Sequence, residues 1–482
     1  DFNAMNYIVY KLNMYLTYLI LILQIFPMSS PYTVTYSNNE CTFNLELSKN
    51  LLIYKPLVNY IMKTITNQPI SEDFKEKYTT FLDKFGSRPS GSRNLENAID
   101  FMKELTNRSG VNDVITENVM VPYWYREYES VEMILPRPKK IAVLGLGYSV
   151  QTPPAGITAQ VIVVTSFEEF NKLEDDKVIG KIVLFNAPYT TYKETVKYRV
   201  ISASKAAEKG AVAVLIRSIT PFSLYTPHTG ALNYKKNIKK IPAAAITLED
   251  ADLIEILYNQ GEKVVLNIKM FNDHDIKLSR NTIIDLKGKL EPEKLVIVSG
   301  HIDSWDVGQG AIDDGGGMMI SWFVPIILNY LNLRPRRTIR AILWTSEELG
   351  LIGGRAYLEK HANELDNITY ILESDEGTFK PLGLEASGSP AANCLIAKIL
   401  KLFSPIDKLK VVKRTGSELS LFLDRGIPGA SLLNQDDRYF WYHHTEADTI
   451  NAQNMTNVLE CAAFWAAIAY VIADIPIDIP RL

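Results

Sequence analysis

Residues 295–303 read LVIVSGHID, and residues 312–317 read IDDGGG. The run of apolar and β-branched residues predicts a buried parallel strand that ends at His301. Ligands of α/β enzymes bind at the carboxyl ends of such strands. Metal-binding histidines usually donate their second ring N–H to a carboxylate, so Asp303 is the candidate that orients this imidazole. The stretch therefore predicts an α/β fold with a metal site at a strand end.

Three further fragments in the same half of the chain supply carboxylates or an imidazole at predicted strand ends. WTSEELG follows a strand-like run, and adjacent side chains at a strand end point in different directions, so Glu347 and Glu348 can have different roles. ESDEG follows another apolar run and supplies Asp375, whereas YHHTEADT precedes a predicted helix and supplies His444. These fragments occupy residues 344–350, 373–377 and 442–449.

The combined set has two imidazoles, three carboxylates and no thiolate, a mixture that suits zinc. Its members are His301, Asp313, Glu348, Asp375 and His444. Two zinc ions that share one carboxylate would use the set symmetrically, with Asp313 as the bridge and an open position for water. Glu347 is then the candidate general base, which takes the proton of the attacking water.

The motifs GHIDSW, AIDDGGG, WTSEELG, ESDEG and YHHTEADT resemble, in order and spacing, those of the zinc exopeptidases related to bacterial leucyl aminopeptidase and glutamate carboxypeptidase. The resemblance extends from about Ser71 to the C terminus and includes FGSRPSGS at residues 85–92. It implies two Zn²⁺ per chain and a doubly wound mixed sheet with helices on both faces. It also implies a cis peptide bond between Asp313 and Asp314.

The resemblance further assigns roles within the predicted set. Asp313 becomes the bridge and Glu347 the base, while His301 is joined by Glu348 or Asp375 as a terminal ligand. His444, not His443, becomes the last ligand because it directly precedes the threonine of the motif. The implied activity is hydrolysis of dipeptides or short peptides with unblocked termini, as a carboxypeptidase or dipeptidase, and the implied assembly is a homodimer.

Three positions outside this set carry open alternatives. Ser417 resembles a substrate-side loop residue, although a helix N-cap explains it equally well. Tyr439 or Tyr442 can help to hold an oxyanion, although packing in an aromatic cluster also accounts for both.

Other functions on the same scaffold are an aminopeptidase, a glutaminyl cyclase with one zinc, and a receptor-like relative that has lost its ligands. The presence of every ligand type, including His301 and Asp375, favours a two-metal hydrolase.

The chain has 482 residues and a net charge of −4, with no basic block that would indicate nucleic acid as a partner. This length predicts more than one folded unit. Residues 71–138 and 279–482 are expected to form the catalytic part. Residues 139–278 resemble an inserted protease-associated α/β domain that shapes or covers the cleft without supplying ligands, so His228 there is expected to have no catalytic role.

The N-terminal region carries a compartment signal. Residues 14–28 form a short apolar run, which predicts a signal peptide within residues 1–30, preceded by extra upstream residues, rather than a stable membrane anchor. We therefore expect a secreted or lumenal protein of the endoplasmic reticulum, Golgi or lysosome, with residues 31–70 as a propeptide or lead-in segment. Three sequons, at Asn107, Asn367 and Asn454, permit glycosylation.

The three cysteines are Cys41, Cys394 and Cys461, and their spacing does not indicate a metal site. Buried free thiols are the favoured interpretation, with a Cys394–Cys461 disulfide as the alternative.

Overall fold

The computed structural model describes residues 34–37, 40–43, 51–414, 416–435 and 438–482. Of the residues before Leu51, the structure describes strands β1 (Val34–Ser37) and β2 (Glu40–Phe43), which pair antiparallel. Leu51–Leu482 form a second compact unit, which contains every element discussed below. The predicted signal peptide lies outside the described residues.

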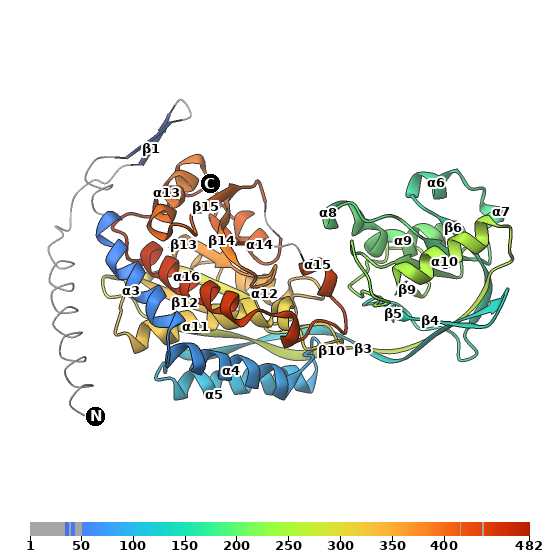
Figure 1. The fold of residues 1–482 in the computed structure, drawn as a ribbon, viewed down its shortest axis with the longest axis horizontal. Coiled ribbons are helices and arrows are strands. Elements are labelled where there is room, and N and C mark those ends of the chain that lie inside the picture. Colours follow the sequence, from blue (N-terminus) through green and yellow to red (C-terminus); the bar gives the residue numbers. More distant parts are fainter. Residues whose placement is uncertain (1–33, 38–39, 44–50, 415, 436–437) are drawn as a thin grey trace. The chain divides into compact units, whose positions relative to one another are not determined.

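A mixed sheet forms the centre of the second unit (Figure 1). At its middle, β11 (Glu291–His301) lies between β12 (Arg337–Trp344) and β13 (Ile368–Glu373) and is parallel to both. β13 is followed across the sheet by β16 (Gly429–Asn434), again parallel. The remaining strands are β14 (Pro381–Ser387) and β15 (Lys408–Val411) beyond β16, and β10 (Val265–Leu286) beside β12.

The predicted central strand is confirmed as the second half of β11. Residues 295–301 are buried on both faces, which explains their continuous apolar sequence. Helices α11 (Gly316–Tyr330) and α16 (Met455–Asp474) pack on this sheet and on each other. Side chains of α12 (Ile352–Lys360) and α14 (Leu419–Leu423) form a separate core cluster with the strands. The predicted doubly wound α/β fold is therefore confirmed.

Two helical segments in the described part of the chain, Ala311–Tyr330 and Met455–Asp474, are long and apolar enough to cross a membrane. The first is 100% buried over its most apolar window and the second 78% buried, because they form the core beneath the sheet.

Within residues 51–113, three helices precede the first long strand: α3 (Lys55–Thr66), α4 (Ile70–Phe85) and α5 (Arg93–Arg108). Helix α3 packs on α16, and just before it the hydroxyl of Tyr54 donates to the carboxylate of Asp474 over 3.0 Å. Part of the predicted lead-in segment is thus packed into the core of the described unit.

The cysteine prediction needs a correction. Cys394, on α13 (Pro390–Leu400), is disulfide-bonded, whereas Cys461 is a buried free thiol. The free-thiol interpretation therefore holds for Cys461 and is wrong for Cys394, and the alternative Cys394–Cys461 pairing does not form.

A second set of strands comes, along the chain, between two long strands, β3 (Val114–Leu135) and β10, which pair antiparallel with each other as a ribbon (Figure 1). We call residues 139–264 the insert segment. Its parallel strands are β6 (Ile157–Val164), β7 (Ile182–Phe185), β8 (Ala213–Arg217) and β9 (Ala243–Ile246), and β5 (Val143–Gly145) pairs antiparallel with β9.

Two core clusters fill the two sides of these strands, and helices that include α9 (Lys197–Glu208) and α10 (Leu248–Asn259) pack there. The shorter elements are β4 (Lys139–Ile141), α6 (Phe167–Lys172), α7 (Asp175–Val178) and α8 (Tyr192–Thr195).

Candidate metal centre

Three neighbouring strand ends supply most of the predicted set. His301 is the last residue of β11 and pairs with Trp344, the last residue of β12. Glu347 and Glu348 follow β12 by a short turn, and Asp375 follows β13. Because parallel strands end at the same edge of a sheet, the register of these strands brings the side chains together.

The first half-site contains His301, Asp375 and one oxygen of Asp313. Nε2 of His301 lies 3.0 Å from Oδ1 of Asp375 and 3.2 Å from Oδ1 of Asp313. Burial by itself would lower the pKa of this imidazole, but the carboxylates of Asp303, Asp313 and Asp375 hold the pKa well above its ordinary value. The ring therefore lies among groups that favour a positive charge.

The second half-site contains His444, Glu348 and the other oxygen of Asp313. Nε2 of His444 lies 3.1 Å from Oε2 of Glu348 and 3.1 Å from Oδ2 of Asp313. Burial alone would lower the pKa of His444, but Glu348 and Asp313 raise it to about 9. Burial and the nearby Asp313 raise the pKa of Glu348 to about 7. The structure thus pairs Asp375 with His301 and Glu348 with His444.

Asp313 joins the two half-sites, because its two carboxylate oxygens face different imidazoles. Its backbone is held by Asp448, whose carboxylate accepts from the N–H groups of Ala311, Ile312 and Asp313 over 2.7–3.1 Å. The peptide bond between Asp313 and Asp314 is cis, as expected. The Asp314 carboxylate turns away and accepts from the N–H of His301 over 3.1 Å. Only Asp313 of this pair therefore faces both imidazoles.

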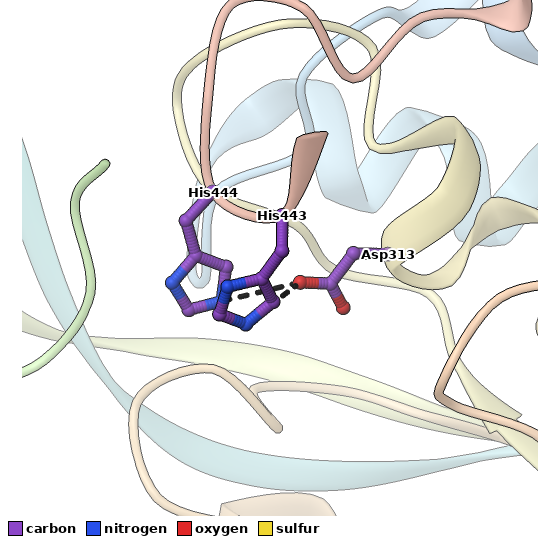
Figure 2. Close-up of side chains that lie close together, drawn as sticks. All are labelled: Asp313, His443 and His444. Atoms are coloured by element: carbon purple, nitrogen blue, oxygen red, sulfur yellow. Dashed lines mark ion pairs between the residues drawn. The ribbon is translucent and has the colours of Figure 1, made fainter. Parts of the chain in front are cut away.

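His443 lies beside His444, and the two rings stack with centroids 3.5 Å apart (Figure 2). Both rings lie within 4 Å of the same oxygen of Asp313, but Nε2 of His443 is 3.7 Å away, compared with 3.1 Å for His444. His443 also packs against Tyr192, Tyr439 and Phe440. The geometry therefore favours His444 over His443 as the imidazole that joins Glu348 in the second half-site.

Asp303 has a different role from the predicted one. The group nearest to Nδ1 of His301 is the backbone carbonyl of Asp303, at 2.9 Å, whereas the Asp303 carboxylate is 3.7 Å away. That carboxylate accepts from the N–H groups of Glu347 and Glu348 over 3.0 and 3.3 Å. Asp303 therefore orients the imidazole through its main chain and fixes the turn that carries both glutamates.

Glu347 points toward the same centre without sharing the contacts of Glu348. Its Oε2 lies 4.0 Å from Nε2 of His301, and burial raises the pKa of its carboxyl group well above the ordinary value. Both glutamates line a cavity of about 1220 Å³ together with Asp313, Asp375 and His444. The cavity gives a substrate access to all of these groups.

The structure decides between the alternatives that the sequence left open for Ser417, Tyr439 and Tyr442. The Ser417 hydroxyl donates to the carboxylate of Asp375, and its backbone has a left-handed φ of 54° rather than an N-cap conformation. The hydroxyl of Tyr439 lies in the cavity lining and donates to the backbone carbonyl of Asp375 over 3.1 Å. Tyr442 does not line the cavity and packs in a small cluster with Ile312 and Phe379. Of the two tyrosines, Tyr439 is the one placed to act.

Three contributors were not singled out from the sequence. Asp448 lies within YHHTEADT, so the motif held a usable signal. Arg88, in FGSRPSGS, is fully buried and donates to the carbonyls of Gly86, Ile302, Gln309 and Gly310 around the loop after β11. The third is the carbonyl of Thr229 in the insert segment, which lies 3.2 Å from Nδ1 of His444. A backbone carbonyl leaves no trace in a residue pattern.

Comparison with known proteins places this arrangement in a family. Residues 281–469 match the model of peptidase family M28. The chain is 42% identical over 431 residues to carboxypeptidase Q of Xenopus laevis, covering 89% of this chain and 92% of that protein. The chain belongs to the carboxypeptidase Q family. Human carboxypeptidase Q is 43% identical over 411 residues, 84% of this chain and 86% of the human protein. The chain is therefore a metallo-exopeptidase.

Solved structures agree with the fold. A peptidase M28 precursor from Shewanella amazonensis superposes with a TM-score of 0.85 at 29% identity, over 90% of this chain and 99% of that one. A zinc aminopeptidase from Bacillus subtilis has a TM-score of 0.66 at 20% identity, over 84% of this chain and 95% of that one. The predicted family and fold class are thus confirmed.

Proposed function

We propose that the chain hydrolyses dipeptides or short peptides with unblocked termini, as a carboxypeptidase or dipeptidase, with two zinc ions. The observation that carries the proposal is the shared position of Asp313. Its two oxygens face two different imidazoles, each of which has its own terminal carboxylate. Such symmetry is the ligand pattern of two metals with one bridge.

The donor set fits zinc on physical grounds. Oε1 of Glu348 is buried and accepts no hydrogen bond from the described residues. Buried carboxylate oxygens without partners are costly, and a bound cation would remove that cost. Two imidazoles with three carboxylates and no thiolate suit zinc. The fit also agrees with the zinc in the name of the Bacillus aminopeptidase.

Bound zinc would supply a water of lowered pKa and a Lewis acid beside the scissile carbonyl. Glu347 accepts the proton of that water as it attacks and then passes the proton to the leaving amine nitrogen. General base catalysis of this kind contributes roughly 10²–10⁴-fold to a rate. Asp303 holds the N–H groups of Glu347 and Glu348, so the base and its neighbouring ligand keep their separate directions.

The cavity walls support a substrate with a free carboxylate. The insert segment contributes Arg199, Lys235, Lys236 and Lys240 to the lining of the cavity that also holds the acidic metal centre. Arg199 is 8% exposed, and its Nη2 donates to the hydroxyl of Tyr192 over 2.8 Å, so its guanidinium is fixed near the cavity. A fixed guanidinium suits carboxylate recognition. This cationic wall favours a carboxypeptidase or dipeptidase over an aminopeptidase, and the names of the close relatives agree.

A panel of dipeptides with free, N-blocked and C-blocked termini tests the substrate class. We expect turnover of the free dipeptide and loss of turnover when the C-terminal carboxylate is amidated. Retained turnover of the C-blocked peptide, together with loss of the N-blocked one, would instead identify an aminopeptidase. Elemental analysis of the purified protein tests the metal content, with two zinc ions per chain expected.

A further inference from the structure

The two candidate imidazole ligands are oriented by different parts of the chain. Nδ1 of His301 faces the carbonyl of Asp303, two residues further along the same strand end. Nδ1 of His444 faces the carbonyl of Thr229, which belongs to the insert segment and is 215 residues away in sequence. Since a carbonyl only accepts, each Nδ1 must carry the proton and leave Nε2 available as a ligand atom.

The insert segment holds Thr229 against the histidines by several contacts. The N–H of Thr229 donates back to the carbonyl of His444 over 3.1 Å, so the two residues exchange contacts in both directions. Next to it, His228 is fully buried, and its Nδ1 lies 2.7 Å from the carbonyl of His443. His444 has a left-handed φ of 62°, a conformation that a non-glycine residue keeps only where its surroundings fix it.

Arg126, on β3, ties this contact to the other half of the metal centre. Its guanidinium binds both carboxylate oxygens of Asp306 over 2.9 and 3.1 Å, and Asp306 lies on the loop that follows His301. The same side chain donates to the carbonyl of Gly145 over 3.0 Å and lies 3.4 Å from the hydroxyl of Thr229. That hydroxyl in turn donates to the carbonyl of Gly145 over 2.7 Å. We call Arg126, Asp306 and Thr229 the clamp.

The clamp is closely packed and largely shielded from water. The side chains of Arg126 and Asp306 are only 12% and 14% exposed, so their two parallel hydrogen bonds form away from bulk solvent. The insert segment also approaches the same loop at Gly147, where a Cβ atom would lie 2.3 Å from the ring of Trp305. The Trp305 ring packs against His444, with centroids 5.5 Å apart. A larger residue would fit at Gly147 only if Trp305, which packs against His444, shifted.

We propose that the insert segment completes the second half-site, because the clamp positions Thr229 so that its carbonyl fixes the ring orientation and tautomer of His444. The clamp residues are not candidate ligands and are not in the cavity lining, so they are positioning residues. The inference rests on the proposed zinc function, but it concerns only one of the two half-sites. It adds a second role to the expected one, in which the insert segment shapes or covers the cleft.

Zinc affinity of each site, measured by competition with a chelator, tests the clamp. Loss of an outer partner of a ligating histidine typically costs 10–100-fold in metal affinity. We expect Thr229→Val to lower the affinity for one of two zinc ions by roughly 10–100-fold and to leave the affinity for the other unchanged. Thr229→Ser, which keeps the hydroxyl, should bind both ions as the wild type does. Arg126→Ala should act in the same direction. The matched control is Arg280→Ala, since Arg280 is another ion-paired arginine, bound to Glu96 and Asp100 away from the metal centre.

Two backgrounds identify the affected half-site. In Asp375→Asn, which disables the first half-site, Thr229→Val should still lower the affinity for the remaining ion. In Glu348→Gln, which disables the second half-site, Thr229→Val should have no further effect on zinc affinity. The absorption spectrum of cobalt in place of zinc should change for Thr229→Val and not for Thr229→Ser. Equal weakening of both ions, or the reverse pattern in the two backgrounds, would overturn the clamp. A wild-type protein that binds fewer than two zinc ions would contradict the proposed function instead, and two-ion binding that Thr229→Val leaves unchanged would contradict only the clamp.

Discussion

The two half-sites of the metal centre share Asp313 but are built in different ways. The first comes from the ends of neighbouring strands β11 and β13, and even its orienting carbonyl belongs to the same strand end as His301. The second combines Glu348 after β12 with His444 from an irregular loop, and its orienting carbonyl comes from the insert segment. The hydrogen bonds of the sheet fix the position of a ligand at a strand end, whereas a ligand in a loop needs additional contacts to hold it. The first half-site should therefore tolerate changes in the insert segment that the second does not.

Glu347 belongs to neither half-site, so its replacement should give the largest effect on rate without an effect on metal. Glu347→Gln keeps the side chain's shape and all five ligands, and we expect two bound zinc ions with kcat lowered roughly 10²–10⁴-fold. Steady-state kinetics on a free dipeptide and zinc counting on the same sample measure this. The control is Glu376→Gln, an acid in the same cavity that should change kcat far less. Loss of zinc in Glu347→Gln would show that this residue is a ligand after all.

Replacing one terminal carboxylate at a time separates the half-sites. Glu348→Gln should lose the ion of the second half-site and Asp375→Asn that of the first, each by more than the roughly 10–100-fold cost of losing an outer partner. Both variants should also unfold at lower temperature in excess zinc than the wild type, because bound metal contributes to folding. Zinc counting and thermal unfolding check the pair. If either variant alone released both ions, the two half-sites would bind zinc as one cooperative unit. That result would contradict the difference between the half-sites described above.

The second half-site should depend strongly on pH. Without metal, His444 has a pKa raised to about 9 from an ordinary 6.5, and Glu348 a pKa raised to about 7 from 4.5. At these two groups the folded metal-free protein holds more protons than the unfolded chain. Their contribution to stability should fall as pH rises, between 4.5 and 7 for Glu348 and between 6.5 and 9 for His444.

Zinc must displace these protons, so its affinity has the opposite trend. We expect affinity to rise by about tenfold per pH unit for each proton displaced and to level above pH 9. Thermal unfolding with and without zinc at several pH values measures both trends. In Glu348→Gln the metal-free stability should lose the part of its slope below pH 7. A metal-free stability whose slope below pH 7 is the same in Glu348→Gln as in the wild type would contradict the raised pKa of Glu348.

The smallest expected effect concerns the tyrosine that supports the first half-site. Tyr439→Phe removes one hydrogen bond to the carbonyl of Asp375, a loss of about 0.5–1.5 kcal/mol, which corresponds to at most about a tenfold change. The change should weaken the ion of the first half-site only, as measured by chelator competition. Tyr442→Phe is the matched control and should have no effect on zinc, since Tyr442 lies outside the cavity lining. Equal effects of the two variants would show that only general packing of the aromatic cluster matters.

Two helix starts show where a local sequence pattern suffices and where a tertiary contact intervenes. The helix predicted after YHHTEADT is α16, whose N-cap Asn454 accepts from two backbone N–H groups. The helix for which Ser417 is a candidate N-cap instead begins at Leu419, because Ser417 turns toward Asp375. A contact with a residue 42 positions earlier outweighs the local capping preference, and a sequence read locally does not contain it.

The sequence by itself predicted which strand ends supply the candidate ligands. Apolar runs that end in His301, Glu348 and Asp375 predict their convergence, because parallel strands in one sheet end at one edge. The pairing of Asp375 with His301 and of Glu348 with His444 needed distances. Only the tertiary structure decided that Asp303 acts through its carbonyl and that Thr229 orients His444. The physical reason is that every residue has a backbone carbonyl, so only the fold decides which one faces an imidazole.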